Sequence, residues 1–517
     1  MERRYRVQSE SAASSPLHET FRHDGLIINL ADPSQLKAKP KSHELVYGRH
    51  FTDHMLEIEW TRQAGWKRPR INPLHHLKIH PAAKVLHYAN ELFEGFKAYR
   101  GVDGKIRLFR PEMNMSRMNR SAIRASLPTF DGEELLKCIG ELVQIDKDWV
   151  PTADEGSLYI RPTFIGTEPF LGVCWSDEAL LYVLLAPCNT YFKDNAPCEP
   201  ISLLANPSVI RAAPGGSGAF KLGANYAPTV MVAKKAEQAG CQQVLWLYGK
   251  EERLTEVGSM NVFVFWTNPV TKGKELVTPS LADGTILPGI TRQTVLELAK
   301  EWNEFTVLER VITMQDIRTS LRRGLLHEFF GVGTSVLVCP VEKIVYRVES
   351  VDAESSAGNG FANGECDSEL LQMPEVPPEE SLASRLFRTI LDIQQGRCRG
   401  TVGKQLFNLI IGYYRCWSIF KHNVQEGQWK FFRLIDNDYH TTLGTDYDPY
   451  SVMHYEPPLF AKEPGTTTYL SRREEWDFMD MGQKRGLSRG DIDAINRLYC
   501  STKESEGEKE EERSQFS

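Results

Sequence analysis

Two kinds of apolar pattern run through the chain from Glu44 to about Tyr346. Short apolar runs are typical of buried strands, and apolar residues three or four positions apart are typical of helices. The strand-like runs are Leu158–Ile165, Leu180–Leu185, Gln243–Tyr248 and Val262–Trp266. Strands and helices intermixed over this length predict an α/β or α+β body large enough for an enzyme.

A helix with a distinct start is predicted from Asp131 onward. The Asp131 carboxylate is expected to accept from the first backbone amides, while Glu134 reaches back in a capping box. Apolar residues then recur at helical spacing, at Leu135, Leu136, Ile139, Leu142 and Val143. A similar stripe predicts a helix over Ser381–Gln395, formed by Leu382, Leu386, Ile390 and Ile393.

Several stretches lack either pattern. Residues 1 to about 42 are polar and mixed in sign, which predicts a loose arm. Residues 350–380 are rich in Ser, Gly, Asn, Glu and Pro, a composition typical of a disordered loop or linker. After Arg399 aromatic residues and long polar segments prevail, and the charged tail from Thr502 is expected to be disordered.

Composition narrows the class of protein. The chain has 517 residues, 41% hydrophobic and 25% charged, which is ordinary for a soluble globular protein of two or three domains. A formal net charge of −7 argues against a nucleic-acid partner. No apolar run reaches the length of a membrane span, and Ala179–Ala186 instead predicts a buried strand.

The N-terminus and the cysteines bear on the compartment. Arginines and serines near the N-terminus resemble a transit peptide, but acidic residues interrupt them at Glu2, Glu10 and Glu19. A cytoplasmic location is therefore expected, with a mitochondrial one as the alternative. The ten cysteines form no CxxC or metal-type pair, and those before residue 350 are expected to be small buried residues in a reducing compartment.

The segment Gly215–Tyr226, GGSGAFKLGANY, places a lysine among glycines. Glycines on both sides of Lys221 let the backbone approach a flat or phosphate-bearing ligand closely. A lysine confined in this way loses its proton through desolvation and becomes a nucleophile toward an aldehyde. The alternative interpretation is a glycine-rich surface loop with a solvated lysine.

A second segment, Leu254–Asn261, adds a carboxylate at Glu256. A buried carboxylate needs a cationic partner, and a pyridinium nitrogen is one. Glu256 at that nitrogen would keep the ring protonated and therefore electron-withdrawing. The alternative is a glutamate at a strand end in a surface salt bridge.

These segments resemble the branched-chain aminotransferases, which are fold-type IV pyridoxal-phosphate enzymes. The resemblance is carried by GGSGAFKLGANYAP around Lys221, by LTEVGSMNVF around Glu256, and by LYIRPTFIGTEP at Leu158–Pro169. It extends to FTDHMLEIEW at Phe51–Trp60, LFEGFKAYRG at Leu92–Gly101, QQVLWLYG at Gln242–Gly249 and ILPGITRQ at Ile286–Gln293. It runs nearly continuously over residues 21–346 and resumes over residues 371–397.

The resemblance implies a role for each matching residue around the cofactor, pyridoxal 5′-phosphate. Lys221 corresponds to the lysine that holds the cofactor as a Schiff base and moves the proton between Cα and C4′. Glu256 corresponds to the partner of the pyridine nitrogen, and Tyr226 to the donor to the phenolic oxygen. The phosphate is expected to bind Arg117 and the backbone amides of Ile290, Thr291 and Thr334. No metal is expected.

The resemblance also implies the substrate pocket. The α-carboxylate is expected near the turn at Gly333, Thr334 and Ser335 and near Ser259, which also borders the cofactor. The walls of the side-chain pocket correspond to Tyr47, Phe93, Tyr159 and Tyr191. Such a pocket stabilises leucine, isoleucine or valine by burial, at about 25 cal/mol per Å² of apolar area. The family also accepts glutamate, for which Arg161 and the tyrosine hydroxyls are candidates. Each tyrosine alone is equally an ordinary core aromatic residue.

Two features depart from the family pattern. Mammalian members carry a redox CxxC after the threonine turn, whereas here Val336 occupies the first cysteine position and Cys339 the second. Thiol–disulfide regulation by that pair is therefore excluded. The other departure is an insertion over residues 350–369, which is expected at the surface.

Residues 442–500 resemble the end of an astacin-type zinc peptidase domain. LGTDYDPYSVMHYEP at Leu443–Pro457, with its Met-turn, and SRGDIDAINRLYC at Ser488–Cys500 carry this resemblance. The family's HExxHxxGxxH helix corresponds to residues 400–415, where no histidine stands at a ligand position and Lys404 and Arg415 would repel a dication. We expect a partial, degenerate domain without zinc or peptidase activity. A working peptidase and a non-catalytic interaction module are the alternatives.

The resemblances imply an α/β (α+β), two-domain fold-type IV aminotransferase with a larger β-barrel-like domain and a partial astacin-like appendage. The expected order is an arm (1–42), a small domain (43–190), a large domain (191–348), a disordered insert (349–370), the last aminotransferase helix (371–397), the astacin-like segment (398–500) and a charged tail (501–517). The implied reaction is reversible, ping-pong transfer of the amino group of leucine, isoleucine or valine to 2-oxoglutarate. It would serve branched-chain amino-acid biosynthesis or catabolism. The family is homodimeric, with active sites near the subunit interface.

Overall fold

The computed structural model describes residues 20–189, 199–347, 368–397, 408–410, 417–419 and 469–471. The chain divides into two compact units, residues 1–411 and 412–517. In the second unit the structure describes strands β20 (Trp417–Ile419) and β21 (Tyr469–Ser471), which pair antiparallel. Within the described residues, no helix combines the length and the apolar character needed to cross a membrane.

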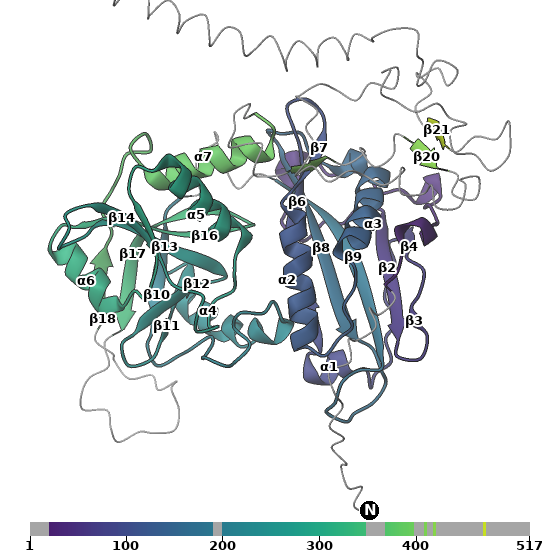
Figure 1. Ribbon diagram of the computed structural model, residues 1–517, viewed down its shortest axis with the longest axis horizontal. Coiled ribbons are helices and arrows are strands. Elements are labelled where there is room, and N and C mark those ends of the chain that lie inside the picture. Colours follow the sequence, from purple (N-terminus) through teal and green to yellow (C-terminus); the bar gives the residue numbers. More distant parts are fainter. Residues whose placement is uncertain are drawn as a thin grey trace, which may run out of the picture. The chain divides into compact units, whose positions relative to one another are not determined.

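The first unit begins with a ten-stranded, mostly antiparallel sheet (Figure 1). Its strands are β1 (Ile27–Ile28), β2 (His54–Thr61), β3 (Gly65–Trp66), β4 (Arg70–Pro73), β5 (Glu91–Phe93), β6 (Phe96–Arg100), β7 (Ile106–Phe109), β8 (Gly156–Gly166), β9 (Glu178–Asn189) and β19 (Asn408–Ile410). The main path is β1-β4-β2-β9-β8-β6-β7-β19, with β3 on β2 and β5 on β8. The predicted strands Leu158–Ile165 and Leu180–Leu185 are confirmed within β8 and β9.

Helices α2 (Pro111–Arg124) and α3 (Gly132–Ile145) pack side by side against this sheet (Figure 1). The predicted start of α3 is confirmed, because Asp131 accepts from the amide of Glu133 at 2.9 Å. The predicted capping box is wrong in its second half. Glu134 accepts from the amide of His23 at 2.6 Å and from Lys137 Nζ at 2.8 Å instead. A distant segment thus supplies the partner that local sequence assigned to the helix start.

Residues 20–28 of the N-terminal arm are packed on the body, so the prediction of a loose arm is wrong for this part, whereas most residues from 29 to 42 are exposed. Phe21 is 3% exposed, and its ring centroid lies 5.0 Å from that of Trp66. Strand β1 also pairs parallel with β4. Burial of one aromatic ring outweighs the polar composition of the surrounding residues.

The remaining short elements of this body are the 3-10 helices η1 (His23–Gly25), η2 (Pro33–Gln35), η3 (Ser42–Glu44) and η4 (Lys147–Trp149) and the helix α1 (Lys84–Tyr88).

A second, nine-stranded sheet closes into a barrel. Its strands are β10 (Ile201–Ala205), β11 (Gln243–Tyr248), β12 (Arg253–Val257), β13 (Met260–Thr267), β14 (Lys274–Thr278), β15 (Thr306–Glu309), β16 (Leu326–Gly333), β17 (Leu337–Arg347) and β18 (Ser368–Gln372). The ring β12-β11-β10-β17-β16-β13 is completed by pairing of β13 with β12. The predicted barrel-like core is therefore confirmed, as are the predicted strands Gln243–Tyr248 and Val262–Trp266.

The helices of this second body are α4 (Thr229–Gln238), α5 (Ile290–Trp302), α6 (Met314–Arg322) and α7 (Leu382–Gln394), with a turn η5 (Gly223–Asn225). The helix predicted over Ser381–Gln395 is confirmed as α7, and the Ser381 side chain accepts from the amide of Ser384. One correction falls on the loop expected over residues 350–380, because β18 pairs antiparallel with β17. Leu371 and Met373 are buried there, so two apolar side chains beside a free strand edge override the polar composition.

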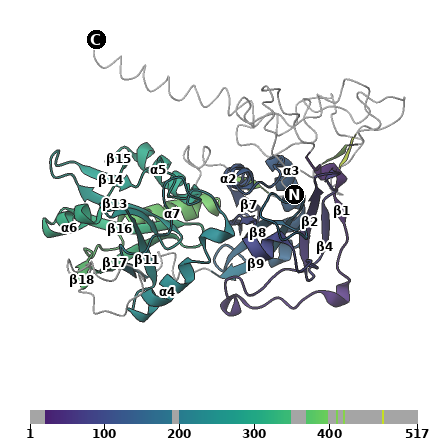
Figure 2. The same ribbon diagram turned by 90° about the horizontal axis from the view of Figure 1, so that it is seen from below.

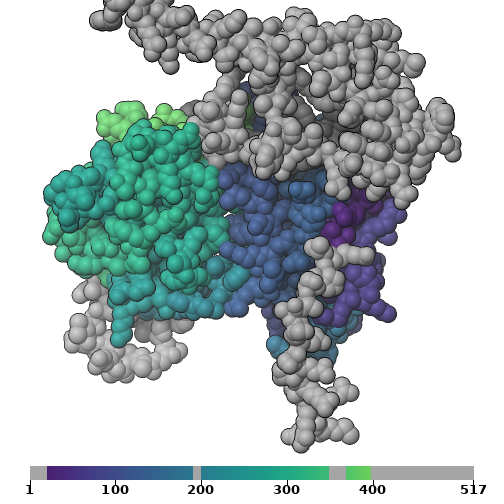
Figure 3. All heavy atoms as spheres, in the orientation of Figure 1, coloured from purple at the N-terminus to yellow at the C-terminus, as the bar shows by residue number. Residues whose placement is uncertain are grey.

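An apolar cluster joins the two bodies of the first unit. Tyr99 and Phe109 from the first sheet pack with Phe263 and Phe330 of the barrel and with Leu386 of α7. The two sheets remain distinct when the molecule is turned (Figure 2), and their atoms form adjoining masses coloured purple to blue and teal to green (Figure 3). Side chains from both bodies can therefore meet at this junction.

Candidate active site

The glycine-rich loop that carries Lys221 is bound to the other body through its backbone. The amide of Lys221 donates to Ser121 Oγ of α2 at 3.0 Å, and its carbonyl accepts from the amide of Phe93 at 3.2 Å. Asn225 Nδ2 donates to the carbonyls of Ser217 and Phe220, at 2.8 Å each. These bonds fix the backbone of the loop at the junction of the two bodies.

The Lys221 amine lies among aromatic rings. Nζ donates to the Tyr226 hydroxyl at 3.2 Å and lies 4.8 Å from the centroid of the Phe93 ring. Burial, followed by the positive charge of Arg117, lowers the pKa of Lys221 to about 8. A much larger fraction of this amine is neutral near physiological pH than for an exposed lysine, and the neutral form is the nucleophile.

Glu256 is a buried carboxylate on the barrel. It lies on β12 opposite Asn261 of β13 and is 3% exposed. Its Oε1 accepts from the amide of Leu287 at 2.8 Å and lies 3.3 Å from Arg211 Nη2. Burial raises the pKa of Glu256, an effect that Arg211 opposes. Burial and then the charge of Glu256 raise the pKa of Tyr226 to about 12, so the Tyr226 hydroxyl keeps its proton at neutral pH.

A cavity of about 190 Å³ lies beside these groups, bordered by Tyr226, Glu256, Ser259, Arg211 and Trp246 among others. Its volume exceeds that of a cavity of about 150 Å³ that binds benzene in another protein. The space is therefore large enough for a six-membered aromatic ring, with Glu256 and Tyr226 at its border.

Arg117 of α2 has a fixed orientation. Its Nε and Nη2 donate to the two oxygens of Glu94, at 2.7 and 2.8 Å, and Nη1 donates to the carbonyl of Pro288 at 3.0 Å. Asn114 Nδ2 also donates to Glu94, at 2.8 Å. Burial acts to raise the pKa of the fully buried Glu94, but the Arg117 guanidinium outweighs it and holds that pKa below its usual range.

The start of α5 lies next to this guanidinium, because Pro288 directly precedes its N-cap, Gly289. Gly289 supplies no capping side chain, so the first amides, including those of Ile290 and Thr291, have no side-chain cap. Such amides and the helix dipole favour an anion. A Cβ at Gly289 would lie 2.0 Å from Asn261 Oδ1, so any other residue there would force the Asn261 side chain to move.

Four further predicted residues, Arg161, Tyr159, Tyr47 and Ser335, form a connected group that reaches the Phe93 ring beside the Lys221 amine. Arg161 Nη2 donates to the Tyr159 hydroxyl at 2.9 Å, and its guanidinium lies 4.7 Å from the Phe93 ring centroid. The rings of Tyr47 and Tyr159 are 5.2 Å apart, and the Tyr47 hydroxyl bonds the side chains of Tyr159 and Ser335. Burial and then Tyr159 raise the pKa of Tyr47. Tyr159 fits because Gly95 beside it has no Cβ, which would lie 1.9 Å from its hydroxyl.

The structure thus brings together most of the residues singled out from the sequence. Thr334 and Ser335 lie in the turn between β16 and β17, and Ser259 lies beside the cavity. Tyr191 falls outside the described residues. Sequence reasoning missed Glu94 and Arg211. A charged residue within the apolar run LFEGF was a usable signal for Glu94, whereas Arg211 had none.

The fold and site define a class of enzyme, the fold-type IV pyridoxal-phosphate-dependent transferases. Residues 91–344 match the family model described as Amino-transferase class IV. The fold is shared with the branched-chain amino acid aminotransferase of Thermobaculum terrenum in its PLP-form, with a TM-score of 0.52 and 20% identity over 70% of this chain and 100% of that one. The branched-chain aminotransferase of Thermoproteus uzoniensis with norvaline also shares the fold, with a TM-score of 0.50 and 22% identity. The match covers 68% of this chain and 99% of that one.

Curated relatives narrow the class. The cytosolic branched-chain-amino-acid aminotransferase of Rattus norvegicus is 51% identical over 380 residues, which is 74% of this chain and 86% of the relative. The mitochondrial branched-chain-amino-acid aminotransferase of Mus musculus is 52% identical over 327 residues, which is 63% of this chain and 82% of the relative. The chain belongs to the branched-chain-amino-acid aminotransferase family.

A separate match covers the C-terminal part of the chain. Residues 415–500 match the family model Astacin (Peptidase family M12A), in line with the resemblance read from the sequence. His422, His440, His454 and the Met-turn lie outside the described residues. Of the stretch aligned with the zinc-binding helix, Asn408–Ile410 are described, and they form strand β19 rather than a helix.

The residues present fit the cofactor of this class, pyridoxal 5′-phosphate. A ring-sized cavity is bordered by the buried carboxylate of Glu256 and by Tyr226, and Tyr226 accepts a hydrogen bond from the lysine with a lowered pKa. An oriented arginine lies beside an uncapped helix start. These features correspond to an aromatic ring, its nitrogen, an aldehyde and a phosphate.

Proposed function

We propose that this chain is a branched-chain-amino-acid transaminase that moves the amino group of leucine, isoleucine or valine to 2-oxoglutarate, reversibly and by a ping-pong mechanism. The observation that carries the proposal is the Lys221 amine. It has a pKa lowered to about 8 and a hydrogen bond to Tyr226. In an aminotransferase family member, a lysine with these properties is the residue that captures the aldehyde.

Each side chain has a task in this proposal. When bound, pyridoxal phosphate supplies an electron-withdrawing ring that accepts the electron pair left at Cα. Lys221 Nζ would accept the proton from the substrate's Cα and later give it back, which an amine with a pKa of about 8 can do near neutral pH. Glu256 would hold the proton on the ring nitrogen, because a buried carboxylate stabilises a cation beside it. The protonated Tyr226 hydroxyl would donate to the phenolic oxygen, while Arg117 and the α5 amides would hold the phosphate.

The substrate assignment rests on the residues around Lys221. Phe93, Tyr47 and Tyr159 present aromatic surface that stabilises a branched apolar side chain by burial. Arg161 is the candidate for accepting the side-chain carboxylate of glutamate or 2-oxoglutarate, because its guanidinium is close to the same rings. Its Nε is buried and lacks a hydrogen-bond partner among the described residues.

The test is a transamination assay of the full chain with leucine, isoleucine, valine and glutamate as amino donors. When loaded with cofactor, the protein is expected to absorb at the boundary of the near-ultraviolet and visible ranges. Lys221→Ala is expected to abolish that band and the activity. Lys250→Ala, on an exposed lysine, is the matched control. An unchanged spectrum in Lys221→Ala, or a wild-type protein inactive with all three branched substrates, would overturn the proposal.

A homodimer is part of the proposal, supported by an exposed apolar surface. Tyr88 of α1 and Phe170, Leu171, Val173 and Trp175 of the loop between β8 and β9 are 41 to 84% exposed. The Tyr88 hydroxyl donates to the carbonyl of Leu171, so helix and loop form one patch. Apolar patches of this kind are typical of interfaces. Sedimentation analysis tests it, and a monomer at micromolar concentration would contradict it.

A cytosolic location is likewise proposed, with a mitochondrial one as the alternative. The 51% identity to the cytosolic relative of Rattus norvegicus, over 74% of this chain, supports the cytosol. Cell fractionation with the full chain distinguishes the two.

The astacin-like segment is proposed to bind no zinc and to cleave no peptide, because residues 400–415 contain no histidine. Stoichiometric zinc that survives dialysis would contradict this.

A further inference from the structure

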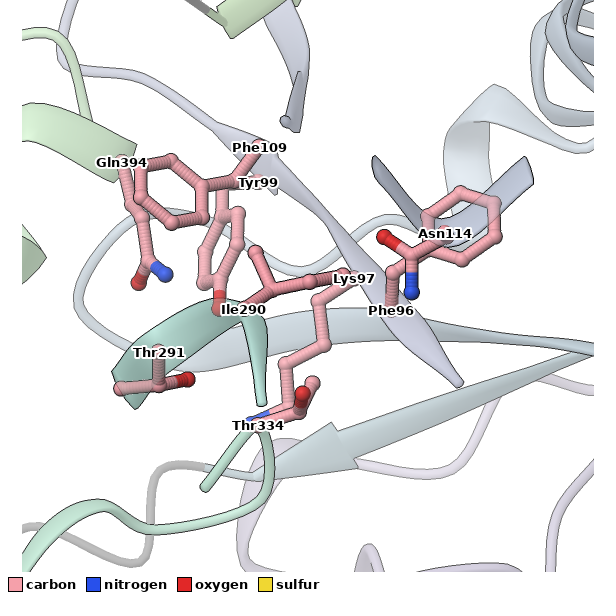
Figure 4. Close-up of a pocket in the computed structure, with 9 residues that line it drawn as sticks. All are labelled: Phe96, Lys97, Tyr99, Phe109, Asn114, Ile290, Thr291, Thr334 and Gln394. Carbon is pink, nitrogen blue, oxygen red and sulfur yellow. The ribbon is translucent and has the colours of Figure 1, made fainter. Parts of the chain in front are cut away.

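Lys97 is a buried lysine at the edge of the site. It lies on β6, is 6% exposed, and donates from Nζ to the carbonyl of Ser335 at 3.0 Å. Figure 4 shows its side chain extending to Thr334, close to Ile290 at the start of α5. The ammonium group therefore stands directly at the turn between β16 and β17.

Lys97 differs from the other buried cations. Five lysine and arginine side chains are buried in the part of the chain that the structure describes, at Lys84, Lys97, Arg107, Arg117 and Arg292. Four of them pair with a carboxylate oxygen at 2.5 to 2.8 Å. Lys97 has no such partner among the described residues, where its hydrogen bond goes to a neutral carbonyl. A buried charge without a counter-charge is costly, so an anion that binds nearby would offset that cost.

We propose that Lys97 is a positioning residue for the substrate's α-carboxylate. Lys97 fixes the Thr334–Ser335 turn and places a positive charge without a counter-charge next to that turn. This inference rests on the proposed transaminase function and adds a residue to it. Every amino acid and oxo acid in the reaction carries the α-carboxylate, so the effect extends to all of them.

The carboxylate is favoured over the phosphate because of what surrounds each position. The proposed function assigns the phosphate to Arg117 and the start of α5, which lie together. Ser335, in contrast, is held from two sides, by Lys97 at its carbonyl and by Tyr47 at its side chain. Burial lowers the pKa of Lys97, and a bound carboxylate would stabilise its charged form.

The test compares neutral and charged replacements in the full chain loaded with cofactor. Lys97→Met removes the charge and keeps an unbranched apolar side chain, and Lys97→Gln keeps a donor for Ser335 but loses the charge. Arg107→Met is the matched control, since Arg107 is a buried cation on the neighbouring strand β7 with its own partner, Asp103. The probe is 4-methylpentanoate, the carboxylate of leucine without its amino group, and its dissociation constant is measured by titration.

Lys97→Met is expected to weaken 4-methylpentanoate binding by about 10- to 100-fold, as for loss of a charge-assisted contact, and Lys97→Gln by less. Arg107→Met is expected to leave the constant unchanged. KM for leucine, glutamate and 2-oxoglutarate should rise together, with kcat changed less. The reaction of 3-methylbutan-1-amine, which lacks the carboxylate, should be unaffected.

Stability gives the readout that separates positioning from a structural role. Because Lys97→Gln removes the unpaired buried charge but keeps a donor for the Ser335 carbonyl, it is expected to melt no lower than wild type, and a lower melting temperature would contradict the inference. An unchanged dissociation constant for 4-methylpentanoate would overturn the inference, whether or not pyridoxal phosphate binding is weakened. If Lys97→Met does not fold, Lys97→Gln decides by the same criteria. Wild-type protein that binds the probe but transaminates nothing would instead defeat the proposed function.

Discussion

The two ends of the site handle charge in opposite ways. At one end Glu94 and Arg117 neutralise each other through two hydrogen bonds, and Asn114 adds a third to the carboxylate. At the other end burial lowers the pKa of Lys221 to about 8 and raises that of Tyr226 to about 12. Glu256 lies near both, with Arg211 as its cationic neighbour. At the first end the two opposite charges are paired, and at the second the pKa values of the amine and the phenol are shifted.

This difference separates two kinds of work. A paired arginine presents its remaining N–H groups in a fixed direction, which suits binding of an anion. An amine with a lowered pKa exchanges protons near neutral pH, which suits catalysis. The same burial therefore gives orientation where charges are matched and reactivity where they are not.

The largest expected effect is on stability at the paired end. Glu94→Gln removes one partner of a buried ion pair and leaves the Arg117 charge uncompensated, which is expected to cost about 3–5 kcal/mol of unfolding free energy. Chemical denaturation measures it. Asp103→Asn is the control, because Asp103 is 39% exposed and its pair with Arg107 is expected to contribute less. Equal losses in the two variants would mean that the buried pair of Glu94 and Arg117 stabilises the fold no more than the partly exposed pair of Asp103 and Arg107.

The next effect is on catalysis at the unpaired end. Glu256→Gln keeps an acceptor for the Leu287 amide but loses the charge that holds the ring nitrogen protonated. We expect kcat to fall by about 10²-fold or more, as when one preorganised electrostatic group is removed. Steady-state kinetics measures this, with Glu297→Gln as a control carboxylate that pairs with Arg110. A kcat within a factor of about two of wild type would remove the role assigned to Glu256.

Covalent capture of the aldehyde should depend on pH through Lys221. Only the neutral amine attacks, and a pKa of about 8 means that the neutral fraction rises about tenfold between pH 7 and pH 9. The rate at which cofactor-free protein binds pyridoxal covalently should follow this rise and level off above the pKa. Stopped-flow absorbance measures it. Arg117→Gln removes a charge that lowers the pKa, so its profile should move to higher pH.

The smallest expected effect concerns the hydroxyl that contacts the amine. Tyr226→Phe removes the hydrogen bond to Lys221 Nζ but keeps the ring that packs on Phe93. We expect kcat to fall about threefold to tenfold, which corresponds to one ordinary hydrogen bond. Tyr248→Phe, outside the site, is the control. No change in kcat would mean that the hydroxyl does not take part in the reaction.

Several elements followed from local pattern alone. Buried strands such as β9 and β11 contain continuous apolar runs, and α7 carries an apolar stripe at helical spacing, so the local pattern was enough to predict them. The corrections share another cause. The Glu134 partner, the docking of Phe21 and the pairing of β18 each depend on residues far away in the chain. Local composition cannot report such contacts.

The sequence by itself determined which chemical groups are available. The motifs show a lysine between glycines and a glutamate in an apolar strand, and these residue types can be recognised without a structure. The domain boundaries and the roles of the site residues remain predictions. Only the tertiary structure decided that Glu94 neutralises Arg117 and that Lys97 has no such partner among the described residues. The physical reason is that charge compensation depends on distance and burial, which are set by how the two bodies pack and not by position along the chain.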